Sequence, residues 1–119
     1  MGLRWYGVVV DAADPARLGR WWAEVLSYPI LHEGNGEIMI GADLGMPCLY
    51  FTPAHEGKVG KNRLHLDLTP DDQDAEIERL VNMGARHVDI GQGAVQWVVL
   101  ADPEGNEFCV LKAQDPLIG

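Results

Sequence analysis

Residues 63–69, Arg-Leu-His-Leu-Asp-Leu-Thr, alternate strictly between polar and apolar side chains. This pattern predicts a β-strand with one buried face. A helical pattern follows, begun by Pro70-Asp71-Asp72 and ended by Gly84. Three more short strands are predicted at 87–90, 95–101 and 107–111, with a tight turn at 102–106 before the last. The stretch 61–111 therefore reads strand, helix, strand, strand, strand.

The first half of the chain repeats this order. A strand is predicted at 5–11, and Asp14-Pro15 supplies the N-cap and first residue of a helix. The helix must end before Pro29. Short strands are predicted at 30–31, 38–40 and 48–51. The apolar stripes of the two helices match, with Leu18 at the position of Ile77.

Two βαβββ modules with helices on one side of each sheet define an α+β fold. Neither module is large enough to be stable alone, so we expect the two to pair and share a core. The expected result is one domain over residues 1–119 with a curved, cup-shaped mixed sheet and helices on its outer face. The expected parts are module one at about 3–53, module two at about 61–112 and a tail at 113–119.

The composition of the chain limits the classes of function that it can have. The chain has 119 residues, a formal net charge of −9 and two cysteines without metal-motif spacing. The acidic balance argues against nucleic-acid and membrane partners. No signal-peptide or membrane-spanning pattern is present, so a cytoplasmic location is expected.

Period-two alternation assigns side chains to the face of each sheet turned away from its helix, here called the open face. In the second module the open face should carry Arg63, His65, Asp67, Glu107 and Cys109. Arg63 would anchor an anionic ligand group or neutralise a neighbouring aspartate. Cys109 lacks an adjacent cation, which favours a pocket-wall role over a reactive thiol.

In the first module, the open face should carry Trp5, Gly7 and Val9, and by the repeat Pro47, Leu49 and Phe51. Trp97 lies in an apolar strand, where alternation does not choose between the two faces. Apolar walls with a few convergent polar groups are typical of a small-molecule site, so these residues are candidate ligand contacts.

The chain resembles the glyoxalase / bleomycin resistance / extradiol dioxygenase superfamily, also called vicinal oxygen chelate proteins. The resemblance rests on Asp-Pro-x-x-Leu-x-x-Trp-Trp at 14–22, Asn-Arg-Leu-His-Leu-Asp-Leu at 62–68 and Leu-Ala-Asp-Pro-Glu-Gly-Asn-Glu-Phe-Cys-Val-Leu at 100–111. It covers residues 3–112. These motifs indicate the fold better than the reaction.

Metal-dependent members of that superfamily hold a divalent ion with His and Glu from the first and last strands of each module. By this resemblance His65 and Glu107 match two of the ligands, whereas Gly7 and Pro47 stand where the others would be. Two protein ligands are few for a firmly held ion. We therefore expect no metal or other cofactor; an ion, if bound, would be held by His65 and Glu107.

Two functions are favoured over a third, a structural or regulatory partner with a vestigial cup. The first is a metal-independent module that binds an apolar or aromatic small molecule, oriented by Arg63, His65 and Glu107. The second is a lyase, isomerase or dioxygenase with Glu107 as general base, His65 as ligand or acid, and a weakly held divalent metal. His65 and Glu107 are thus the candidate catalytic residues, although a merely hydrogen-bonded pair would give the same pattern. The resemblance also implies a homodimer.

Overall fold

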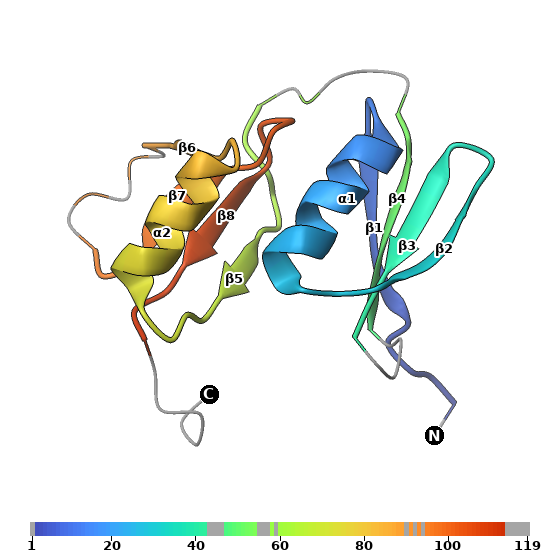
Figure 1. Ribbon diagram of the computed structural model, residues 1–119, viewed down its shortest axis with the longest axis horizontal. Coiled ribbons are helices and arrows are strands. Elements are labelled where there is room, and N and C mark those ends of the chain that lie inside the picture. Colours follow the sequence, from blue (N-terminus) through green and yellow to red (C-terminus); the bar gives the residue numbers. More distant parts are fainter. Residues whose placement is uncertain are drawn as a thin grey trace. The chain divides into compact units, whose positions relative to one another are not determined.

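The computed structural model describes residues 2–42, 47–54, 58, 60–89, 91, 93 and 95–113. The chain forms two compact units, Met1–Gly57 and Lys58–Gly119, each described by itself below. Each unit holds one helix and a four-stranded sheet that mixes parallel and antiparallel pairs (Figure 1). The predicted α+β class and the repeated order of elements are confirmed.

The first unit contains β1 (Gly7–Ala12), α1 (Pro15–Leu26), β2 (Ile30–Gly34), β3 (Glu37–Ile40) and β4 (Cys48–Pro53). The sheet order is β1-β4-β3-β2, with β1 and β4 parallel. The helix begins as the sequence predicts, because the Asp14 side chain accepts a hydrogen bond from the Arg17 N–H at 3.3 Å. It ends at Ser27, whose φ of 55° turns the chain out of the helix.

One face of α1 packs on its sheet and forms the core of the first unit. Leu18 and Trp22 on the helix are buried, as are Ile38 and Phe51 on the strands. Gly19 marks the closest approach, since a Cβ added there would overlap Ile38 Cγ2 and lie 3.2 Å from Phe51 Cδ1. This contact fixes which side of the sheet faces the helix.

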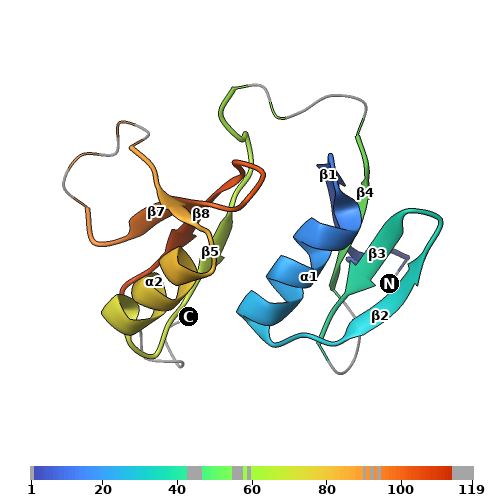
Figure 2. The same ribbon diagram turned by 45° about the horizontal axis from the view of Figure 1, so that its top comes forward.

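The second unit contains β5 (Leu66–Leu68), α2 (Gln73–Asn82), β6 (Arg86–His87), β7 (Val98–Ala101) and β8 (Glu107–Val110). The sheet order is β5-β8-β7-β6, with β5 and β8 parallel. Asp72 caps α2 by accepting the Ala75 N–H at 3.1 Å. Both views show α2 lying along its own sheet (Figures 1 and 2), and Leu80 of α2 is buried.

A buried aspartate organises the turn before β8. Asp102 is 1% exposed, and its Oδ1 accepts the N–H groups of Glu104 and Asn106, each at 2.9 Å. The Asn106 side-chain amide donates to Asp102 Oδ2 at 3.0 Å. These bonds satisfy a carboxylate that burial would otherwise penalise, and they set the point where β8 starts.

The strand predicted at 63–69 is shorter in the structure. Its ladder to β8 runs from the pair Leu66–Phe108 to the pair Leu68–Val110. Leu64, predicted to face the helix, is instead 87% exposed. Ile90, predicted to end a strand, and the tail beyond 113 lie outside the described residues.

Candidate functional site

The open face of the first unit follows from the parallel register of β1 and β4. Paired residues of parallel strands project to the same side, and the helix-side pairs are Val8 with Leu49 and Val10 with Phe51. The open-face pairs are Gly7 with Cys48, Val9 with Tyr50 and Asp11 with Thr52. Thr52 Oγ1 donates to Asp11 Oδ1 at 3.3 Å, which fits this assignment. The predicted facing of Gly7 and Val9 is therefore confirmed.

The prediction that Leu49 and Phe51 lie on the open face was wrong. Phe51 is fully buried and lies against α1 near Gly19, and Leu49 shares its side of the strand. The error came from aligning β4 with β8 one residue out of step. A one-residue slip moves every side chain of a strand to the other face.

The same slip affects the position predicted for Pro47. Gly7 pairs with Cys48, whereas Leu66 pairs with Phe108 and so His65 comes level with Glu107. Cys48, not Pro47, thus takes the place of Glu107 in the first unit. A Cβ added to Gly7 would lie 2.5 Å from the Cys48 carbonyl oxygen and 2.7 Å from its Sγ, so the strands leave no room for a side chain there.

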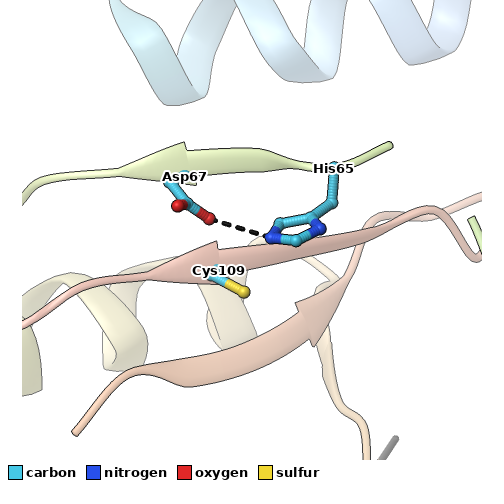
Figure 3. A group of neighbouring side chains, drawn as sticks. All are labelled: His65, Asp67 and Cys109. Carbon is cyan, nitrogen blue, oxygen red and sulfur yellow. Dashed lines mark ion pairs between the residues drawn. The ribbon is translucent and has the colours of Figure 1, made fainter. Parts of the chain in front are cut away.

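His65, Asp67 and Cys109 gather on the open face of the second unit (Figure 3). His65 Nε2 lies 3.1 Å from Asp67 Oδ1. Asp67 and Cys109 are directly paired across β5 and β8. One potential ligand atom from each of the three residues lies within 4.8 Å of the other two. The sequence predicted the shared face but not the contact between His65 and Asp67.

The thiol of Cys109 lies in surroundings that oppose its ionisation. Burial raises its pKa, and the charge of Asp67 and a hydrogen bond to Asp67 raise it further, against a weaker opposite effect of Lys61. A nucleophilic cysteine needs a lowered pKa. The direction of this shift argues against an activated Cys–His nucleophile, and the pocket-wall role of Cys109 stays a prediction from the sequence.

Glu107 opens β8 with its carboxylate engaged by partners upstream of β5. Lys58 Nζ lies 2.8 Å from Glu107 Oε2, and the Asn62 N–H donates to Oε1 at 2.7 Å. The Asn62 side-chain amide also donates to the Glu107 carbonyl oxygen at 3.4 Å. The side chains of Lys58 and Glu107 are only 19% and 11% exposed. The ion pair is thus partly shielded from water, where it is stronger than a surface pair.

The pKa of Glu107 reflects this environment. Burial raises the pKa, but the Lys58 ammonium and the Asn62 N–H together lower it by more, so the net pKa lies below its ordinary value. A carboxylate of lowered pKa is a weak proton acceptor at neutral pH. The sequence missed this because Lys58 falls in the polar connection between the two halves.

His65 and Glu107 therefore have different partners within the second unit. The imidazole pairs with Asp67, and the Glu107 carboxylate pairs with Lys58 and Asn62. Backbone register alone places the two residues level with each other. The sequence identified the residues but not their partners.

The remaining candidates are exposed. Trp5 is 68% exposed and donates its Nε1–H to the Gly7 carbonyl oxygen at 3.2 Å. Val9 is 65% exposed on the open face of β1. Arg63 precedes β5 and is exposed, and Trp97 is 41% exposed just before β7. These four remain candidate ligand contacts.

Tyr50 was missed as an open-face residue. Its hydroxyl donates to Glu37 Oε1 at 2.7 Å, and the pKa of Tyr50 is raised chiefly by that bond. Met39 on the neighbouring strand β3 pairs with Tyr50, and the Met39 sulfur lies 4.0 Å from the Tyr6 hydroxyl oxygen. The alternation Leu49-Tyr50-Phe51-Thr52 could have revealed this face.

Residues 7–111 match the sequence model of the Glyoxalase-like domain family. The chain belongs to this family. A search of curated proteins found no match. Within the described residues, no helix has both the length and the apolar character needed to cross a bilayer.

Solved structures share the fold of this glyoxalase-like chain at low sequence identity. A glyoxalase/bleomycin resistance protein/dioxygenase family enzyme from Burkholderia phytofirmans is 15% identical with a TM-score of 0.76, covering 94% of this chain and 100% of its own. An antibiotic-binding protein from Streptomyces is 17% identical with a TM-score of 0.68, at 96% and 99% coverage. The trypanothione-dependent glyoxalase I of Leishmania major is 12% identical with a TM-score of 0.69, at 93% and 87% coverage.

The donors at the four superfamily positions do not fit the divalent ion implied by the resemblance. Gly7 offers no side chain and no room for one. Cys48 offers a buried thiol, and Glu107 is already neutralised by Lys58. Of the four positions, His65 and Glu107 carry the usual residue types, and the Glu107 carboxylate is engaged by Lys58. We therefore derive no step through an ion at these positions.

Proposed function

We propose that this chain is a small-molecule-binding member of the glyoxalase-like family, and that it binds an apolar or aromatic ligand through the open faces of its sheets. The ion pair between Lys58 and Glu107 carries this proposal. It neutralises the residue that an enzymatic member would use as general base or metal ligand. Binding on such a surface needs neither a proton acceptor nor an ion.

The chemistry of the open faces supports the same function. The first unit presents Val9 and Tyr50 on its open face and the indole of Trp5 beside it, which offer apolar and aromatic contact area. The second unit, taken by itself, presents the polar side chains of Arg63 and His65, which would orient a ligand bound there. One structural neighbour is an antibiotic-binding protein, so the fold supports such binding elsewhere.

Ligand-observed NMR with a library of aromatic drug-like molecules tests the proposal. We expect several compounds to bind the wild type and to lose affinity in Val9→Asp, because a carboxylate on the apolar face must be desolvated. Val81→Asp is the matched control, since Val81 is an exposed valine on α2, away from the open face. The control should retain binding.

The enzymatic alternative is an outcome of the same experiment. Chemical conversion of a bound compound, abolished in Glu107→Gln, would overturn the proposal in favour of a lyase, isomerase or dioxygenase. Failure of every aromatic compound to bind, or equal losses in Val9→Asp and Val81→Asp, would also contradict it.

A further inference from the structure

We propose that His65, Asp67 and Cys109 bind a borderline transition-metal cation, of the type of Zn²⁺ or Co²⁺, on the open face of the second unit. This inference goes beyond the proposed function, which needs no ion. It also differs from the ion implied by the resemblance, because it uses Asp67 and Cys109 in place of Glu107. All three donors belong to one compact unit.

The backbone places the donors together. Asp67 and Cys109 are cross-strand partners in the parallel ladder of β5 and β8. His65 lies two residues before Asp67, so its side chain projects to the same face, as Figure 3 shows. The three ligand atoms lie within 4.8 Å of one another. An ion with bonds of about 2.0–2.3 Å needs donors slightly closer than that limit, so binding would require the side chains to rotate toward one another.

The donor set selects the kind of ion. One imidazole nitrogen, one carboxylate oxygen and one sulfur match the ligands of zinc sites, whereas Mg²⁺ and Ca²⁺ prefer oxygen alone. Three protein ligands leave one position of a tetrahedral ion for water or a ligand atom. His65 and Asp67 are about half exposed, which leaves that position accessible within the unit.

The charges around Cys109 favour a cation. The Asp67 carboxylate lies beside the Cys109 thiol, directly across the β5–β8 ladder, so two acidic groups share this part of the open face. A bound divalent ion would offset the charges of the carboxylate and the thiolate together. On binding, the thiol proton passes to solvent and the sulfur binds the metal.

Glu107 does not belong to this site. Its carboxylate is held by Lys58 Nζ at 2.8 Å and by the Asn62 N–H at 2.7 Å. Recruiting it would require breaking a partly buried ion pair. The geometry thus separates the proposed site from the arrangement of His65 with Glu107.

Cobalt titration of the full-length, chelator-treated protein tests the proposal without any organic ligand. We expect Co²⁺ to produce a near-ultraviolet thiolate-to-cobalt charge-transfer absorption at one ion per chain. Cys109→Ser should abolish the absorption, and Cys48→Ser should retain it, because Cys48 is the other buried thiol and serves as the matched control. Asp67→Asn should weaken cobalt binding by at least roughly tenfold, since even outer-shell changes cost about 10–100-fold.

Three outcomes would overturn the proposal. The first is no sulfur-to-cobalt absorption in the wild type, and the second is an absorption that survives in Cys109→Ser. The third is loss of cobalt binding in Glu107→Gln but not in Asp67→Asn, which would assign the ion to His65 and Glu107. Thermal unfolding of each metal-free variant confirms that it is folded before titration. The organic-ligand screen uses no added ion, so failure of one proposal leaves the other separately testable.

Discussion

At the scale of single residues, function turns on what each ionisable group contacts. Glu107 is a strand-opening glutamate whose position the sequence gives correctly, but its lowered pKa comes from Lys58 and Asn62. His65 is bound to Asp67 two residues away on the same strand. Side-chain pairing of this kind depends on rotamers and loop conformation, which alternation of residue types does not encode.

The lowered pKa of Glu107 predicts a pH dependence of stability. The folded state holds the Glu107 proton less tightly than the unfolded chain, so its contribution to stability is present above the unfolded pKa and is lost as the pH falls through the folded pKa. In Glu107→Gln, unfolding free energy should therefore fall less steeply between neutral and acid pH than in the wild type. Urea unfolding at a series of pH values measures this.

Glu78→Gln serves as the control for that experiment, because Glu78 is an exposed residue on α2. Its pH dependence should follow the wild type more closely than that of Glu107→Gln. Equal slopes for Glu107→Gln and the wild type would contradict the assigned role of the ion pair.

The close contact at Gly7 predicts that this position tolerates no side chain. Gly7→Ala should destabilise the fold by about 1–3 kcal/mol, as is usual for overpacking, because the new Cβ meets the Cys48 carbonyl. Gly2→Ala is the control, since a Cβ at Gly2 meets nothing within 4 Å. Chemical denaturation measures the stability of each variant. If Gly7→Ala is as stable as the wild type, β1 and β4 separate more easily than described.

The same contact bears on any attempt to restore the superfamily histidine. Gly7→His adds a much larger side chain than Gly7→Ala at the same crowded point. It should destabilise the fold at least as much and should not create a metal site.

At the scale of elements, the sequence predicted which helices and strands exist better than it predicted the register of the strands. Both helices begin close to where the sequence predicts, because the side chains of Asp14 and Asp72 accept local backbone hydrogen bonds from Arg17 and Ala75. The facing of β4 was predicted wrongly, because the repeat was followed instead of the local alternation of Leu49 with Tyr50. A short strand flanked by turn residues can slip by one position without changing its composition, and its ladders to β1 and β3 fix the register.

The packing of α1 on its sheet predicts a strong dependence on Gly19. Gly19→Ala would gain roughly 1 kcal/mol of helix propensity, but the clash with Ile38 Cγ2 should outweigh it and give a net loss of about 1–2 kcal/mol. In a double-mutant cycle with Ile38→Ala, we expect the sum of the stability losses of the two single variants to exceed the stability loss of the double variant by at least roughly 0.5 kcal/mol. Strict additivity would contradict the contact.

At the scale of the whole molecule, the repeated pattern predicted the α+β class and the repeated order of elements, and the resemblance of the motifs at 14–22, 62–68 and 100–111 predicted the family. It could not predict the partner of Glu107, because Lys58 lies outside both repeats. Nor could it predict the cluster of His65 with Asp67 and Cys109, which needs the register of β5 against β8. The homodimer, the cytoplasmic location and the pairing of the modules into a cup remain predictions from the sequence.

The central proposal is that Glu107 serves as an ion-paired structural carboxylate rather than as a catalytic base. The most direct measurement is its pKa, followed by carboxyl-detected NMR during a pH titration of the wild type and of Lys58→Ala. We predict a pKa below the ordinary value for glutamate in the wild type, and a higher one in Lys58→Ala, where burial acts with less compensation. A wild-type pKa raised toward neutrality, or one unchanged by removing Lys58, would contradict the claim.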